Sequence, residues 1–315
     1  MSEFSLPLAF EPVFMERVWG GRKLESLYHK KIPPQKCIGE SWEIVDRSEA
    51  QSIVRDGPLA GRSIHDLWVN FRREIFGEVP DAPRFPLLIK LLDCREKLSL
   101  QVHPPARVAG FLGGEPKTEA WIIVDAAPDA ELWLGLREPT EPQKFAEALN
   151  SGQAAELVHR IRVKTGDAFL IPSGRMHAIG GGNLIVEVQE NSDTTYRIFD
   201  WNRRDENGQA RELHIEEAMR CIDFEDCSPA PSPGNTESLV ADRLFAIERW
   251  KISSARELGS GNSFAIAFCL QGELECAGSR FQQGEFFLLP AQAENRTVKS
   301  CRPNSELLRI TIPSS

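Results

Sequence analysis

The sequence lacks the features that mark several classes of protein. No two of its seven cysteines form a CxxC pair, and an odd number argues against a disulfide framework or a thiolate zinc site. No apolar run approaches the ~20 residues that a membrane helix requires. The start, MSEFSLPLAFEPVF, has neither the basic region nor the apolar stretch of a signal peptide. A net charge of -9 argues against a nucleic-acid partner. We therefore expect a cytoplasmic protein with free thiols.

Most of the chain consists of short strand-like runs separated by Gly and Pro turns, which is typical of β-barrels and sandwiches. The strands expected in its first two thirds are 41–45, 86–93, 98–103, 119–125, 167–172, 183–189 and 194–201. Helices are expected over 63–77 with Ser63 as its cap, over 140–152 with a capping box from Thr140 to Gln143, and over 212–222.

The segment 228–239, SPAPSPGNTESL, is dense in Ser, Pro and Gly, which predicts a linker. A chain of 315 residues is long enough for two domains. We expect a larger β domain over 1–227 and a smaller one over 240–315.

A candidate metal site begins in LSLQVHPP, where Gln101 and His103 lie two residues apart on a predicted strand. That spacing turns both side chains to the same face. The next strand opens with PKTEAW and offers Glu119. A third segment, GDAFLIPSGRMH, places His177 after a Gly/Pro-framed turn. Two imidazoles, a carboxylate and an amide oxygen suit Zn²⁺, although the ligand chemistry alone also admits iron, manganese or nickel.

The spacing of GDAFLIPSGRMH resembles the second motif of the cupin superfamily of β-barrels. A comparable run, GEFFLLP, occurs at 284–290, but Gln292 and Asn295 stand where that motif has Gly and His. The resemblance implies a mainly β fold of two cupin-type (jelly-roll) β-barrels with a small helical portion. The second barrel is expected to lack metal ligands.

Nearly the whole chain resembles the type I mannose-6-phosphate isomerase (phosphomannose isomerase) family, in its shorter bacterial branch. The matching segments, in order, are RVWGGRKL, GESWEI, LSLQVHP, PKTEAW, PSGRMHAIGGG and VEVQENSDTTYRIFDWNR. The resemblance implies one Zn²⁺ per chain. Its ligands would be Gln101, His103, Glu119 and His177.

The same resemblance implies the roles of further residues. The family's active-site lysine falls on Lys117, its arginine on Arg197, and a basic residue associated with substrate phosphate on Arg203. Ser99 also matches. Longer relatives read His-Lys-Pro-Glu where this chain reads Pro-Lys-Thr-Glu, so a histidine proposed for proton transfer is absent and weight shifts to Lys117.

The implied reaction interconverts mannose 6-phosphate and fructose 6-phosphate through a cis-enediolate. We expect a Lys117 whose pKa is depressed by the zinc charge to move the proton. Arg197 would stabilise charge, and Arg203 would bind phosphate through its fork of N–H groups. Glu187 and Asp193 are candidates for binding substrate hydroxyl groups or for supporting the metal ligands.

Two alternatives remain open from the sequence. One is an iron-dependent cupin dioxygenase, and the other is a non-catalytic cupin that binds a sugar phosphate. The partner in each case is a small molecule, and the sequence predicts no particular oligomeric state.

Overall fold

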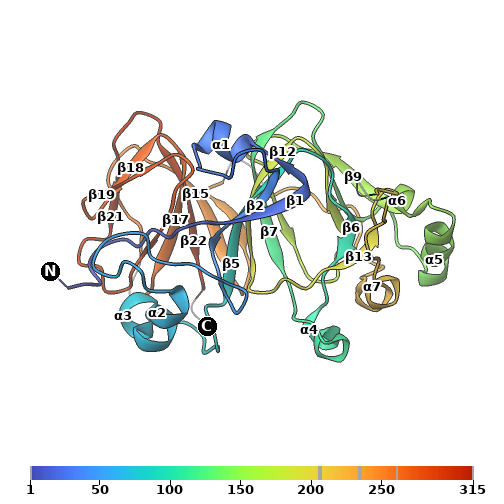
Figure 1. Cartoon of the computed structure of the whole chain (residues 1–315), viewed down its shortest axis with the longest axis horizontal. Coiled ribbons are helices and arrows are strands. Elements are labelled where there is room, and N and C mark those ends of the chain that lie inside the picture. The colour runs from blue at the N-terminus through green and yellow to red at the C-terminus, as the bar shows by residue number, and fades with distance from the viewer. Residues whose placement is uncertain (1, 205–207, 233–235, 260–261, 314–315) are drawn as a thin grey trace.

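The computed structural model describes residues 2–204, 208–232, 236–259 and 262–313. These residues form mainly antiparallel sheets, arranged as one pair in the N-terminal part and one in the C-terminal part (Figure 1). The mainly β character predicted from the sequence is confirmed. No helix within these residues is both long and apolar enough to cross a membrane.

The largest sheet has six strands and carries much of the site. In spatial order they are β1 (Val13–Gly21), β2 (Ile38–Ile44), β5 (Leu87–Cys94), β12 (Asn183–Glu190), β7 (Glu119–Ala126) and β10 (Ala168–Ile171). A five-stranded sheet faces it, ordered β13 (Tyr196–Phe199), β6 (Leu100–Val102), β11 (His177–Ile179), β8 (Glu131–Leu136) and β9 (Val158–Arg162).

The C-terminal part contains the second pair of sheets. The five-stranded member is ordered β14 (Ser238–Ala241), β15 (Ala246–Lys251), β22 (Glu306–Thr311), β17 (Ala265–Gln271) and β20 (Phe286–Leu289). The four-stranded member is ordered β16 (Arg256–Glu257), β21 (Thr297–Ser300), β18 (Glu273–Cys276) and β19 (Ser279–Gln282). A separate ribbon joins β3 (Asp46–Arg47) to β4 (Ala50–Gln51).

Short helices lie at the edges of the sheets (Figure 1). They are α1 (Lys23–Tyr28), α2 (Ile64–Asn70), α3 (Arg72–Ile75), α4 (Ala106–Ala109), α5 (Pro142–Asn150), α6 (Ala154–Leu157), α7 (Ile215–Cys221) and the 3₁₀ turn η1 (Gly110–Leu112). Although α3 belongs to the N-terminal part, the backbone carbonyl of Ile75 accepts a hydrogen bond from Ala291. Leu8 likewise pairs with Leu288 of β20. Segments from the start of the chain therefore pack on the C-terminal sheets.

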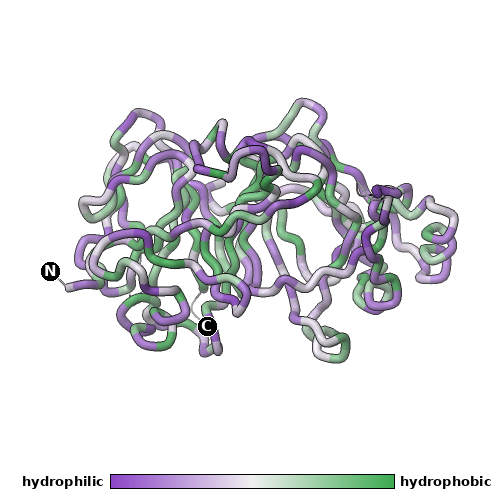
Figure 2. Tube along the Cα trace, viewed as in Figure 1, coloured by the Kyte–Doolittle hydropathy of each residue, from purple (hydrophilic) through white to green (hydrophobic). Residues whose placement is uncertain are grey.

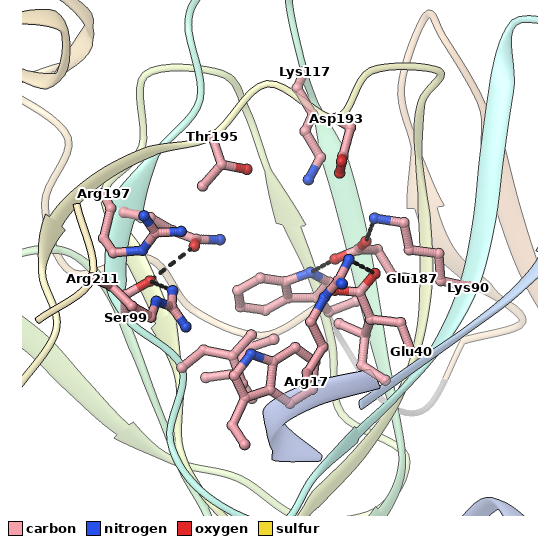
Figure 3. Close-up of a pocket in the computed structure, with 16 residues that line it drawn as sticks. Arg17, Glu40, Lys90, Ser99, Lys117, Glu187, Asp193, Thr195, Arg197 and Arg211 are labelled. Carbon is pink, nitrogen blue, oxygen red and sulfur yellow. Dashed lines mark hydrogen bonds and ion pairs between the residues drawn. The ribbon is translucent and has the colours of Figure 1, made fainter. Parts of the chain in front are cut away.

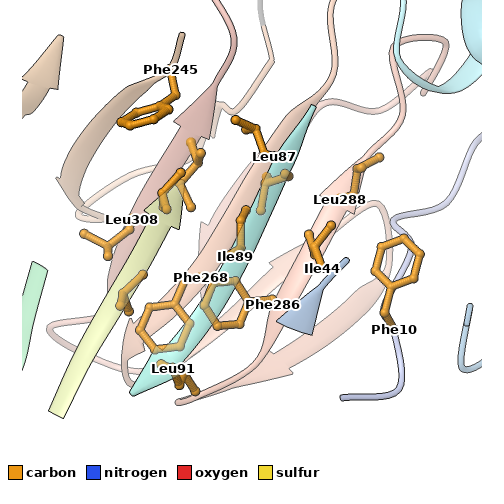
Figure 4. Packing of buried hydrophobic residues seen from close by; sticks show 14 of the residues in the cluster. Phe10, Ile44, Leu87, Ile89, Leu91, Phe245, Phe268, Phe286, Leu288 and Leu308 are labelled. Atoms are coloured by element: carbon orange, nitrogen blue, oxygen red, sulfur yellow. The ribbon is translucent and has the colours of Figure 1, made fainter. Parts of the chain in front are cut away.

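The six-stranded sheet is buried on both faces, so its apolar residues serve two cores. In β5, Ile89 and Leu91 face the C-terminal sheets, where they pack with Phe268 and Leu308 (Figure 4). Leu92 belongs instead to the core between the two N-terminal sheets. This alternation follows from the two-residue period of a strand. Figure 2 shows hydrophobic stretches along the central strands and hydrophilic stretches in the outer loops.

The expected elements can be compared with these bounds. Each expected strand overlaps an observed one. Ser63 caps α2 as predicted, because its Oγ accepts a hydrogen bond from the Asp66 amide at 3.1 Å. The capping box at Thr140 is wrong: Glu141 is the N-cap, and the Thr140 hydroxyl bonds to the Glu138 carbonyl. Pro142 explains the shift, because proline favours the first helical position.

The predicted linker lies only partly within the described residues. Residues 233–235 fall outside them, and β14 begins at Ser238, inside the segment 228–239. The division at 227 and 240 stays a prediction.

Candidate active site

A cavity of about 390 Å³ lies between the two N-terminal sheets (Figure 3). Both sheets and the loops at their ends contribute polar side chains to its walls. The lining residues are Arg17, Trp19, Glu40, Lys90, Leu92, Leu98, Ser99, Gln101, Lys117, Trp121, Ile179, Glu187, Asp193, Thr195, Arg197 and Arg211.

Four side chains predicted to bind metal meet beside this cavity, and of the four only Gln101 is among its described lining residues. Gln101 lies on β6 opposite His177, which begins β11, and His103 follows the end of β6. Glu119 begins β7 and reaches across from the facing sheet. Its carboxylate oxygens lie 3.3 Å from His103 Nε2 and 3.5 Å from His177 Nε2. His103, Glu119 and His177 are buried, and one ligand atom of each lies within 4.8 Å of the others.

The two imidazoles are oriented by backbone carbonyls. His103 Nδ1 lies 2.9 Å from the Thr194 carbonyl oxygen, and His177 Nδ1 lies 3.0 Å from that of Arg175. Each carbonyl accepts a hydrogen bond, so the proton sits on Nδ1 and the Nε2 lone pair faces Glu119. Metal-bound histidines commonly have this arrangement, in which the ring nitrogen away from the metal donates to a carbonyl oxygen.

The convergence leaves buried polar atoms that need a cation. His103 Nε2 and Glu119 Oε1 are buried without a hydrogen-bond partner, and Glu119 Oε2 has the Lys117 ammonium beside it, at 3.1 Å. Burial and the charge of Lys117 lower the pKa of His103 to about 3, and burial lowers that of His177. Neutral imidazole nitrogens facing a carboxylate repel it unless a cation lies between them. The residues therefore fit a divalent metal ion.

Gln101 completes the set. Its Nε2 lies 3.1 Å from His177 Nε2, and Ser99 Oγ donates to its Oε1 at 3.4 Å. The two polar atoms of an amide differ by a half-turn of the group. A half-turn would present the oxygen to the point where the other three ligands converge.

Lys117 lies next to this cluster and is buried. Its Nζ is 3.1 Å from Glu119 Oε2. Burial lowers the pKa of Lys117, but the charges of Glu119, Glu187 and Asp193 outweigh it and raise the pKa. In the chain itself the direction is therefore opposite to the expected depression, because the acidic neighbours dominate.

Arg197 and Arg211 lie side by side at one end of the cavity (Figure 3). Arg211 Nη2 donates to Ser99 Oγ at 3.4 Å, and Ser99 in turn bonds to Gln101. Arg197 donates to the Glu212 carbonyl at 2.8 Å, while its buried Nε has no described partner. Burial lowers the pKa of both guanidinium groups, and for Arg211 the charge of Arg197 adds to the effect. Two half-buried cations placed together attract an anion, and Asp200 Oδ2, 3.4 Å from Arg211 Nε, balances part of their charge.

Arg203 is not among the described residues that line the cavity with Arg197 and Arg211. Its Nη2 donates to the Lys97 carbonyl and lies 3.9 Å from Asp200 Oδ1. The structure thus brings Ser99, Lys117, Glu187, Asp193 and Arg197 together around the four candidate metal ligands, but it does not bring Arg203 to them.

Known proteins can now be compared with this arrangement. A probable mannose-6-phosphate isomerase of Bacillus subtilis is 40% identical over 309 residues, which cover 93% of this chain and 96% of that protein. The chain belongs to the type I mannose-6-phosphate isomerase family. The model of the type I phosphomannose isomerase catalytic domain matches residues 8–120.

Solved structures agree with this assignment. The crystal structure of mannose 6-phosphate isomerase from Bacillus subtilis is 34% identical, with a TM-score of 0.86 over 97% of this chain and 99% of that chain. A zinc-bound mannose 6-phosphate isomerase, 17% identical, shares the fold with a TM-score of 0.77 over 97% and 99% of the two chains. The family resemblance inferred from the sequence is confirmed.

Sequence reasoning missed four charged residues of this family member's cavity: Arg17, Glu40, Lys90 and Arg211. One signal was available, because Lys90 interrupts the apolar run PLLIKLL of a strand buried on both faces. Arg17 and Glu40 occur in strands where charged residues are common. Arg211 follows residues 205–207, which lie outside the described part of the chain.

Proposed function

We propose that this chain is a zinc-dependent aldose–ketose isomerase that interconverts mannose 6-phosphate and fructose 6-phosphate. The proton moves between C1 and C2 through a cis-enediolate. The observation that carries the proposal is the buried cluster of His103, Glu119 and His177, with Gln101 against His177, beside Lys117 and the Arg197–Arg211 pair. It supplies a metal site, a titratable group and an anion site along one cavity.

One Zn²⁺ per chain is proposed, held by Gln101, His103, Glu119 and His177. The orphaned buried atoms and the Nδ1 hydrogen bonds support it. So does the zinc in a solved mannose 6-phosphate isomerase of the same fold. When bound, the ion supplies positive charge that stabilises the enediolate oxyanion.

Lys117 is proposed to carry the proton. Its Nζ borders both the cavity and Glu119. Glu119 has the largest effect of the three carboxylates that favour the ammonium form, so a Glu119 that served as a metal ligand would raise the Lys117 pKa less. Arg197 cannot readily lose its proton, so it orients the substrate and balances charge. Glu187 is the alternative base, and Asp193 a contact for a hydroxyl.

The phosphate is proposed to bind at the Arg197–Arg211 end, with Ser99 as a further donor. The sequence assigns this role to Arg203. The position of Arg211 on the cavity wall, and of Arg203 against the Lys97 carbonyl, favours Arg211. Variants of the two arginines separate these assignments, as described in the Discussion.

The two pairs of sheets are proposed to be cupin-type jelly-roll barrels, the second without metal ligands. Two corresponding glycines support this reading. Gly166 and Gly284 each precede a strand, β10 or β20, by two residues, and both have φ near +90° (+97° and +89°). Such φ values favour glycine. In the second pair, the Asn295 side chain accepts a hydrogen bond from the Thr297 amide.

The direct test couples fructose 6-phosphate formation to a dehydrogenase assay, with mannose 6-phosphate as substrate and with or without a chelator. We expect turnover that a chelator abolishes and Zn²⁺ restores. Oxygen consumption in place of isomerisation would indicate the dioxygenase alternative. Tight binding of the sugar phosphate without turnover would indicate the non-catalytic alternative.

A further inference from the structure

A row of charged side chains crosses the inner face of the six-stranded sheet, on the wall opposite Arg197 and Ser99 (Figure 3). Arg17 lies on β1, Glu40 on β2, Lys90 on β5 and Glu187 on β12. Their charges alternate along four neighbouring strands. We call these four residues the charged row.

Each member of the charged row is held by its neighbours. Arg17 Nε lies 2.9 Å from Glu40 Oε1, and its Nη2 lies 3.2 Å from Oε2. Lys90 is directly opposite Glu187 in the strand register, with 3.3 Å between Nζ and Oε1. Two indoles complete the pairing: Trp42 Nε1 donates to Glu40 at 2.7 Å, and Trp121 Nε1 donates to Glu187 at 3.0 Å.

The charged row is costly in this position. The side chains of Lys90 and Glu187 are 4% and 5% exposed. Removing paired charges from water costs several kcal/mol per ion, and well-packed apolar residues often stabilise a fold better. The flanking residues Ile89 and Leu91 face the apolar core on the other side of the same strand. The row therefore places paired charges on the cavity wall, where a polar ligand can reach them.

The chemistry of the row fits hydroxyl groups. A lysine ammonium has three N–H donors, and Lys90 has Glu187 as its one ion-pair partner among the described residues. Each carboxylate oxygen accepts more than one hydrogen bond. A donor adjacent to an acceptor matches vicinal hydroxyls, since every hydroxyl both donates and accepts.

We propose that Lys90, held by Glu187, is a specificity-determining residue. It binds the sugar hydroxyls between the reacting carbons and the phosphate. This inference rests on the proposed function, because that function places C1 and C2 at Lys117 and the phosphate at Arg211. The middle of the carbon chain then lies against the charged row.

The test measures equilibrium binding to the zinc-loaded protein, which does not require turnover. Mannitol 6-phosphate presents hydroxyls and a phosphate but no carbonyl group. Ethyl phosphate presents the same phosphate charge without hydroxyls. The proteins compared are the parent, Lys90→Met, and the matched control Lys144→Met, whose lysine is 57% exposed on α5.

We expect Lys90→Met to weaken mannitol 6-phosphate binding by about 10- to 100-fold, the usual loss for a hydrogen bond to a charged group. Ethyl phosphate binding should change by about three-fold or less, since the row lies on the opposite wall from the arginine pair. Lys144→Met should match the parent for both ligands. Equal weakening of both ligands, or of neither, overturns the proposal.

A second variant covers the case in which Lys90→Met does not fold. Glu40→Gln keeps the size of the side chain and an oxygen for Trp42, and it should weaken mannitol 6-phosphate about three- to ten-fold with ethyl phosphate unchanged. A Glu40→Gln protein that binds both ligands like the parent contradicts the proposal. Failure of the isomerase function would appear separately, as a parent protein that binds mannitol 6-phosphate but does not turn over mannose 6-phosphate.

Discussion

Replacing Arg211 by Ala tests where the phosphate binds. The Arg211 side chain is 30% exposed, and its Nε lies 3.4 Å from Asp200, so part of its charge is already balanced. A hydrogen bond to a charged group contributes about 1.5–3 kcal/mol to binding. Because Arg211 is partly exposed, we take its contribution to be about 2 kcal/mol, near the middle of that range. That corresponds to a rise of about 30-fold in the KM for mannose 6-phosphate. The phosphate does not react, so kcat should change little.

The assay compares Arg211→Ala with Arg203→Ala on mannose 6-phosphate and on unphosphorylated mannose. Arg203→Ala is the matched control, since Arg203 contacts the same Asp200 but lies off the cavity. It should raise the KM by about three-fold or less. Arg211→Lys should recover only part of the loss, because lysine lacks the fork. A larger effect from Arg203→Ala, or an equal loss on mannose, would refute the assignment to Arg211.

Four further outcomes are expected. Lys117→Met should keep zinc and lower kcat by roughly 10²–10⁴-fold, with C2 proton exchange falling in parallel; near-parental turnover would exclude Lys117 as the base. His103→Ala should lose zinc by elemental analysis while His159→Ala retains it. Burial raises the pKa of Glu40, but Lys90 and Arg17 lower it overall from 4.5. The ionised Glu40 carboxylate therefore contributes its whole stabilising free energy at a pH above 4.5. That contribution is lost as the pH falls through the lower pKa of Glu40 in the folded protein. The difference in unfolding free energy between the parent and Glu40→Gln should shrink in acid, and a difference that grew would contradict this sign. Phe268→Ala, between the two pairs of sheets, should cost about 3–5 kcal/mol in denaturant unfolding without loss of zinc; an unchanged midpoint would argue against that core.

Local patterns predicted the strands and three of the four residues of the candidate metal site. Gln101 and His103 share a face because of the strand period, and Gly166 and Gly174 turn the chain with φ of +97° and +95°, as the Gly/Pro-framed motif indicates. Glu119 was harder to place from the chain alone. It belongs to the facing sheet, and only the packing of the two sheets brings it to the histidines.

The other features of the cavity depend on how strands far apart in the sequence pair in the sheets. Arg17, Glu40, Lys90 and Glu187 come from four separate strands, and nothing in their local sequence places them in one row. Arg203 is absent from the described cavity lining, and it follows Trp201 and Asn202, which both have positive φ, +56° and +57°. The phosphate role implied for Arg203, six residues after Arg197, stays a prediction. The pKa of Lys117 depended on Glu187 and Asp193, which approach it only in the fold.

The loop residues 193–195 contact both the proposed zinc site and the cavity. The Thr194 carbonyl fixes the tautomer of His103, while its neighbours Asp193 and Thr195 line the cavity. A sugar phosphate that contacts these neighbours would also restrain the carbonyl between them. In kinetic terms, ion release requires His103 to turn away, so an occupied chain should lose its ion more slowly than an empty one. Substrate would then protect the enzyme from chelators during turnover, and the lifetime of the metal site would depend on substrate supply.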